Sequence, residues 1–181
     1  MSNIKKENLA KIAEELIWYG GKSPDGRWEI FICVDFDYTL TCKGSWTTGK
    51  FVENPGCFEI LDKWAKEFNC KYVLDTMRSG DRALEAANWC EEHGLNFIGI
   101  NKNPYQDEGE YSTRKSWCAY SIDDHNLGCP LVYPEDGGRP YVDWYEIDKE
   151  MRKILRPLSE LLNEMEDSVL AVKAEVMAKN N

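Results

Sequence analysis

The sequence predicts an α/β protein in which parallel strands alternate with amphipathic helices. Short apolar runs bounded by polar residues are typical of buried strands, and they occur at residues 30–34, 71–74, 95–100 and 119–122. Apolar residues at helical spacing lie between them, at residues 54–68 and 81–93. Strands that alternate with helices favour a parallel sheet with right-handed crossovers.

The expected helices have start and stop signals. An N-terminal helix within residues 3–19 is followed by Gly20 and a second glycine, which end helices readily. The next helix is expected to start at Asn54 as its cap, with Pro55 in the first turn. The helix at 81–93 is expected to stop at Gly94.

The last part of the chain is helical in pattern. Its apolar residues fall near heptad spacing from about residue 143, and Pro157 is expected to kink or divide the helix. We therefore expect a core at residues 1–142 and a helical C-terminal extension at 143–181. The extension either packs on the N-terminal helix or associates with a second copy to form a homo-oligomer.

Size and charge narrow the possible functions. The chain has 181 residues, enough for one domain with an extension, and a formal net charge of -10. An acidic surface argues against non-specific binding to the nucleic-acid backbone. The seven cysteines form no C-x-x-C pair, and no stretch approaches the length of a membrane span. These features predict a cytoplasmic protein with reduced thiols and no membrane partner.

Polar side chains follow three of the predicted strands. Asp35 and Asp37 come directly after the first strand, Thr76 after the second, and Asp123 and Asp124 after the fourth. Ligands bind at the carboxyl ends of the strands in an open α/β sheet. Clustered carboxylates resist joint ionisation unless a cation lies between them, and oxygen ligands suit Mg2+. The sequence therefore predicts a magnesium site that could serve phosphoryl transfer.

These residues, in this order, resemble the motifs of the haloacid dehalogenase-like (HAD) superfamily of hydrolases. The stretch DFDYT, which begins at Asp35, fits the first family motif D-x-D-x-T. Thr76 corresponds to the hydroxyl residue that closes the next strand. The resemblance implies a three-layer Rossmann-like fold with a parallel sheet.

Two further motifs complete the resemblance, which covers roughly residues 28–131. The family lysine corresponds to Lys115, with Arg114 as the alternative, because few residues separate Lys115 from the final strand. The acidic motif corresponds to Asp123 and Asp124.

The resemblance implies a role for each residue. Asp35 is the nucleophile that forms an aspartyl-phosphate, and Asp37 is the general acid and base. Thr76 and Lys115 bind the transferring phosphoryl group and assist catalysis. Arg78 is either a substrate-binding residue or an exposed arginine at a helix entry.

The resemblance also implies a cofactor and an open site. Mg2+ is held by Asp35, by Asp37 through its backbone carbonyl and by Asp123, with Asp124 either a further ligand or a residue just outside the coordination sphere. The loops at 41–54 and 101–113 are too short to form a folded cap domain. The expectation is a capless member that acts on large substrates or is covered by a partner.

The expected activity is Mg2+-dependent hydrolysis of a phosphorylated substrate. Sugar phosphates, nucleotides, polynucleotide ends and phosphoproteins all stay open as substrates. One alternative is a catalytically weak HAD-like binding or accessory protein. Another is a phosphotransferase that uses the same aspartate with a different acceptor.

Overall fold

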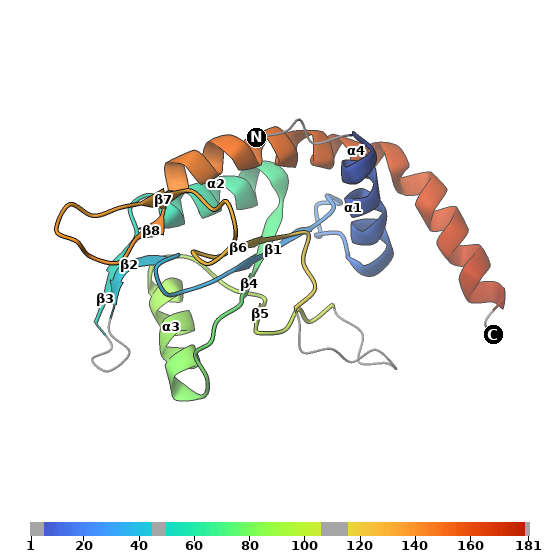
Figure 1. Ribbon diagram of the computed structural model, residues 1–181. Coiled ribbons are helices and arrows are strands. Elements are labelled where there is room, and N and C mark those ends of the chain that lie inside the picture. The colour runs from blue at the N-terminus through green and yellow to red at the C-terminus, as the bar shows by residue number, and fades with distance from the viewer. Residues whose placement is uncertain (1–5, 45–49, 106–115, 180–181) are drawn as a thin grey trace.

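A computed structural model describes residues 6–44, 50–105 and 116–179 of the chain. At its centre lies a four-stranded parallel sheet in the order β5-β4-β1-β6 (Figure 1). Its strands are β1 (Ile30–Val34), β4 (Cys70–Leu74), β5 (Gly99–Ile100) and β6 (Tyr120–Ile122). Helices flank this sheet, so the chain has the predicted Rossmann-like α/β fold.

The central position of β1 follows from its composition. All five of its residues are apolar and buried, as expected of a strand that is paired on both sides and covered on both faces. Val34 is level with Leu74 of β4 and with Ile122 of β6. The residues that follow these three positions, Asp35, Asp75 and Asp123, therefore leave the sheet side by side.

The structure has four helices in the described ranges: α1 (Lys6–Tyr19), α2 (Cys57–Phe68), α3 (Asp81–Glu92) and α4 (Trp144–Lys179). Phe58 of α2 lies against Trp89 of α3 and against His93, which follows that helix. The long helix α4 runs along α2 and then along α1 before it extends past them (Figure 1). None of these helices combines the length and the hydropathy that a membrane span needs.

The buried part of α4 belongs to the same hydrophobic core as the sheet. Trp144, Met151, Leu155, Leu158 and Leu162 are buried in one cluster that also contains β1 and α1. The ring of Trp144 packs on that of Trp64 in α2, with 6.1 Å between centroids. Removing α4 would therefore expose much of the core.

Pro157 does not divide α4, which the structure shows as one helix. A proline inside a helix removes a backbone hydrogen bond and crowds the preceding turn. Here the leucines on either side, Leu155 and Leu158, are fully buried and hold both halves against the core. Tertiary packing thus outweighs the local cost, and the expected division of the helix at Pro157 is wrong.

The expected start of α2 at Asn54 is also wrong. The helix begins at Cys57, after Gly56 with φ of 83°. The Asn54 side chain is turned inward, where its amide donates hydrogen bonds to the carbonyls of Thr39 and Val142, each at 2.8 Å. The carbonyl of Thr39 also accepts a bond from the Trp144 indole at 2.7 Å.

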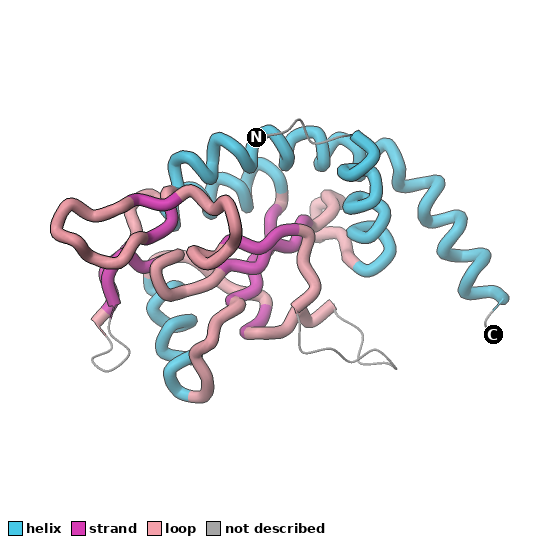
Figure 2. Tube along the Cα trace, in the orientation of Figure 1, coloured by secondary structure: helices cyan, strands magenta, loops and turns pink. Residues whose placement is uncertain are grey.

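Two short hairpins replace segments that the sequence suggested were loops. They pair β2 (Thr41–Gly44) with β3 (Phe51–Glu53), and β7 (Leu131–Val132) with β8 (Tyr141–Val142). Figure 2 shows the four as short strands, with a long loop between β7 and β8. The third strand, which was predicted at residues 95–100, is shorter in the structure and spans Gly99–Ile100.

Asn54 should be a stabilising residue because it joins three distant parts of the chain. Asn54→Ala leaves the buried carbonyl of Val142 without this donor and weakens the support of Thr39. We expect the free energy of unfolding to fall by about 1–3 kcal/mol in urea titrations. Asn88→Ala, at an exposed position of α3, is the matched control and should change it by less than about 0.5 kcal/mol. Equal effects of the two changes would contradict this role.

Candidate active site

The strand ends bring the predicted carboxylates together. The backbone N–H of Asp35 donates to the carbonyl of Ile122 at 3.0 Å, which continues the pairing of β1 with β6. On one side of β1, strand β6 leads to Asp123. On the other side, strand β4 leads to the turn that contains Thr76. The topology therefore gathers these predicted residues at one edge of the sheet.

Thr39 connects the two acidic segments. Its hydroxyl donates to Asp35 Oδ2 at 3.2 Å and accepts from the backbone N–H of Asp124 at 3.2 Å. The side chain is fully buried, and the turn that places it passes through Tyr38 with φ of 60°. This left-handed residue reverses the chain directly after the strand, so that Thr39 comes back over Asp35.

Asp35 is in an environment that opposes its charge. Burial, together with the nearby charges of Asp123 and Asp37, raises its pKa from 3.8 to about 7. Hydrogen bonds from the Phe36 backbone and from Thr39 act in the opposite direction. A divalent cation at this position would relieve the repulsion between the carboxylates.

The acidic pair and His125 form a compact cluster. One ligand atom from each of Asp123, Asp124 and His125 lies within 4.8 Å of the others. Asp124 Oδ2 accepts from Arg139 at 2.7 Å, whereas its buried Oδ1 accepts no hydrogen bond from the described residues. His125 Nδ1 lies 3.2 Å from that oxygen but is not oriented as a hydrogen-bond donor to it.

The residues present fit a hard cation such as Mg2+. The available donors are carboxylate oxygens, and an unpartnered buried oxygen on Asp124 is suited to a metal or its water ligand. His125 is highly exposed and its nitrogen is not a donor that Mg2+ favours. The candidate side-chain ligands are therefore Asp35, Asp123 and Asp124, and the backbone carbonyl of Asp37 stays a predicted ligand.

Asp37 is held by Arg78 in a bidentate ion pair. The guanidinium donates to its two oxygens at 2.8 and 2.7 Å, and the Arg78 side chain is only 1% exposed. The rings of Phe36 and Phe51 flank the guanidinium carbon at 4.9 Å each. Arg78 is therefore not the exposed helix-entry arginine that was one of its two expected roles.

Thr76 lies at the end of β4 in a tight turn. Its hydroxyl accepts from the backbone N–H of Arg78 at 3.2 Å, and its own N–H donates to Asn101 Oδ1 at 2.7 Å. Asn101 follows β5 and has φ of 52°, so it turns back toward β4. Asn101 was not predicted as a site residue, although a polar residue after a parallel strand was a visible signal.

Arg139 was missed as well, because its segment reads as a loop. It comes from the β7–β8 connection, bonds Asp124 and lies over the ring of Tyr38 at 4.1 Å. Lys43 of β2 bridges to Asp136 in the same connection at 3.1 Å. The two hairpins are thus tied together beside the acidic residues.

Lys115 and its alternative Arg114 lie outside the described residues. The cation expected to face Asp35 therefore stays a prediction from the sequence. Asp35, Asp37, Thr76, Arg78, Asp123 and Asp124 are all described.

Comparison with known proteins supports the fold. A solved structure, of a conserved protein coded by a locus from Bacteroides thetaiotaomicron, is similar to this chain at 29% sequence identity with a TM-score of 0.53. The match covers 69% of this chain and 91% of that chain. No protein-family model matches the chain, and no curated protein does.

Asp35 should make stability depend on pH when no divalent cation is bound. Its pKa is higher in the folded state than the ordinary 3.8, so its contribution to stability falls as pH rises from about 4 to about 7. Asp35→Asn removes this pH-dependent contribution to the free energy of unfolding. We expect the variant to match the wild type near pH 4 and to exceed it by roughly 2–4 kcal/mol at pH 8.

The measurement is urea unfolding in chelator at several pH values. Asp62→Asn, at an exposed position of α2, is the control and should follow the wild type. If the free energy of unfolding depended on pH in the same way in the wild type and in Asp35→Asn, Asp35 would not be in an environment that disfavours its charged form.

Proposed function

We propose that this protein is a Mg2+-dependent phosphohydrolase of the HAD type. The observation that carries the proposal is the position of Asp35 at the carboxyl end of the central strand, beside Thr39 and the acidic pair that follows β6. A carboxylate with a raised pKa among other carboxylates in this part of an α/β sheet is a typical functional arrangement. The motif resemblance supplies the reaction class.

In the proposed reaction Asp35 is the nucleophile. One of its oxygens attacks phosphorus, and the bond from phosphorus to the leaving oxygen breaks as the aspartyl-phosphate forms. Asp37 gives a proton to the leaving oxygen, then accepts one from the water that attacks phosphorus in the second step. That step releases inorganic phosphate and restores Asp35 and Asp37.

The surrounding groups orient these partners. The Thr39 hydroxyl fixes one oxygen of Asp35, which leaves the other for attack. Thr76 and Lys115 are the proposed contacts for the transferring phosphoryl group. Mg2+, held by Asp35, Asp123 and Asp124, would screen the repulsion between the nucleophile and an anionic phosphate ester.

The ion pair of Asp37 with Arg78 sets a condition on this reaction. Both oxygens of Asp37 accept from Arg78, so proton transfer must use the second lone pair of one of these oxygens while the pair with Arg78 fixes its direction. We propose Arg78 as the residue that positions Asp37. The same pair is the one observation that favours the alternative of a catalytically weak binding protein, because it occupies the acid and base.

The proposed substrate is a phosphate ester that an open site can accept. The β2–β3 and β7–β8 hairpins stand beside the site, and neither contains a folded cap in its described residues. A phosphotransferase would use the same residues, with a hydroxyl in place of water.

Asp35→Asn tests the nucleophile. An amide is a poor nucleophile, so turnover should fall by several orders of magnitude with the fold intact. The assay is phosphate release from a panel of phosphorylated metabolites and oligonucleotides in Mg2+, with Asp62→Asn as the matched control. Activity near the wild-type level in Asp35→Asn would remove it from the proposed role.

Arg78→Lys tests the positioning role. Lysine keeps the charge but cannot form the bidentate pair, so Asp37 should lose its orientation. We expect kcat to fall about tenfold or more with KM nearly unchanged, the pattern of an interaction that serves the transition state. Arg82→Lys, at an exposed position of α3, is the control. A rise in KM at unchanged kcat would instead assign Arg78 to substrate binding.

A further inference from the structure

In the described part of the chain, two arginines bond carboxylates of the candidate site, and they differ in how accessible they are. The Arg78 side chain is only 1% exposed, and it donates to both oxygens of Asp37. The Arg139 side chain is 42% exposed, and it donates to Asp124 through Nη2. Its Nε and Nη1 form no hydrogen bond with any described residue. Arg139 therefore keeps donors that a ligand can use.

Arg139 is held in place without those donors. Its guanidinium carbon lies over the ring of Tyr38, 4.1 Å from the centroid, and Tyr38 directly follows Asp37. Its Nη2, which bonds Asp124, also lies 3.2 Å from His125 Nε2. A side chain that is already fixed loses little further conformational freedom when it binds a ligand.

The segment that carries Arg139 is fixed as well. Asp136, in the β7–β8 connection, accepts from Lys43 of β2 at 3.1 Å and from the backbone N–H of Gly138 at 3.0 Å. These bonds join the connection to the β2–β3 hairpin. The backbone therefore presents Arg139 at the edge of the acidic site in a defined position.

A short series of hydrogen bonds relates Arg139 to the proposed nucleophile. Asp124 accepts from Arg139, and the backbone N–H of Asp124 donates to the Thr39 hydroxyl. That hydroxyl donates to Asp35 Oδ2. Arg139 is thus close to Asp35 but does not contact it, which suits a contact with a second part of the same substrate.

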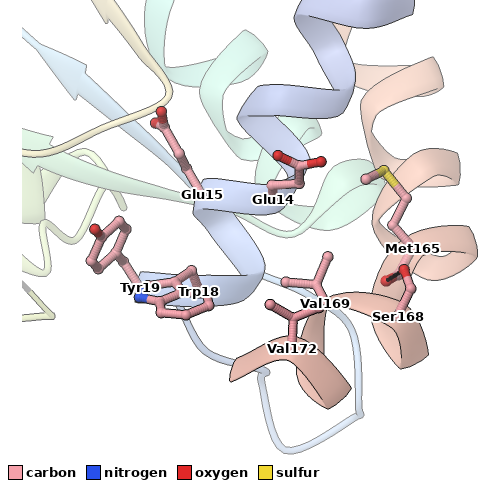
Figure 3. A pocket seen from close by; sticks show the side chains of 8 residues that line it. All are labelled: Glu14, Glu15, Trp18, Tyr19, Met165, Ser168, Val169 and Val172. Carbon is pink, nitrogen blue, oxygen red and sulfur yellow. Dashed lines mark hydrogen bonds between the residues drawn. The ribbon is translucent and has the colours of Figure 1, made fainter. Parts of the chain in front are cut away.

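Two other hollows of the described surface lack the charge to bind an anion. The groove between α1 and α4 is lined by apolar and aromatic side chains, a serine and two glutamates (Figure 3). The hollow along α3 has Asp81, Glu85 and Glu92 among its lining residues. Neither is lined by a lysine or an arginine, so the edge of the acidic site at Arg139 is the better place for an anionic group.

We propose that Arg139 binds a second anionic group of the substrate, a phosphate or a carboxylate, and so selects phosphate esters that carry one. This inference rests on the proposed function, because it concerns the same site. A guanidinium binds either anion through its N–H donors, with the charge assisting each hydrogen bond. Lys115 stays the predicted contact of the transferring phosphoryl group, so the two cations serve different parts of the substrate.

Equilibrium titration of the Asp35→Asn protein tests the proposal without turnover. The probes are two matched pairs of esters in saturating Mg2+: fructose 6-phosphate with fructose 1,6-bisphosphate, and glycerol 3-phosphate with 3-phosphoglycerate. In at least one pair, the ester with the second anionic group should bind about tenfold to a hundredfold more tightly, as expected of a charge-assisted contact. The two pairs distinguish a phosphate from a carboxylate.

Arg139→Gln in the same protein should abolish this preference, because glutamine has no charge. Arg139→Lys should keep part of it. Arg82→Gln, at an exposed position of α3, is the matched control and should keep all of it. Any effect of these changes on Asp124 acts on both esters of a pair, so the ratio of their dissociation constants isolates the contact with the second group. Circular dichroism checks that each variant is folded.

The absence of a preference in both pairs, including a failure of all four esters to bind, would overturn the proposal. A preference that survives Arg139→Gln would overturn it as well, and so would an equal loss of affinity for both esters of a pair, which would assign Arg139 to Asp124 alone. Phosphate release by the wild type is measured separately. A preference that depends on Arg139, with no release from any ester, would contradict the proposed hydrolase and leave this inference standing.

Discussion

The structure of the candidate site depends on the repulsion between carboxylates that the sheet forces together. The register of β1 with β6 sets Asp35 and Asp123 on adjacent chains at the same level of the sheet. Both strands are anchored in the core, so the backbones that carry these two carboxylates are held close together. Burial of Asp35 and the charge of Asp123 raise its pKa to about 7, and the buried hydroxyl of Thr39, which joins the two segments, compensates only in part. An arrangement that is unfavourable by itself becomes favourable once a cation binds, which is how a site can be built for a metal-dependent reaction.

The sequence was sufficient for the parts of the fold that depend on local pattern. The buried run Ile30–Val34 predicts β1 at its observed bounds, because a short apolar run bounded by polar residues is typical of a strand that is covered on both faces. The carboxyl-end placement of Asp35 and Asp123 followed from the strands alone. Prediction from local sequence pattern was wrong where contacts between distant residues determine the local structure. Asn54 reads as a helix cap, but it bonds Val142, which is 88 residues away. Pro157 reads as a break, but buried leucines on both sides keep the helix continuous.

The same limit applies to the site. Arg78 and Asp37 are 41 residues apart, and nothing in either local sequence shows that they meet. The pair exists because Phe36 and Phe51 enclose the guanidinium, and Phe51 is positioned by a hairpin that the sequence did not reveal. Arg139 likewise reaches Asp124 from a segment that looks like a loop. These contacts link the reactive turn after β1 to the hairpins and, through Asn54 and Trp144, to the start of α4, so the helical extension supports the site as well as the core.

The central claim is that Asp35 and the acidic pair after β6 form one site for a divalent cation, and its most direct test is calorimetric titration of Mg2+ into the apoprotein. The account predicts saturable binding that is lost or greatly weakened in Asp123→Asn and retained in Asp136→Asn, a change at an exposed acidic position of the β7–β8 connection. It also predicts proton release near pH 7 on binding, measured in buffers of different ionisation enthalpy, because Asp35 must be charged to hold the metal. The absence of Mg2+ binding, or equal binding in the wild type and Asp123→Asn, would contradict the account.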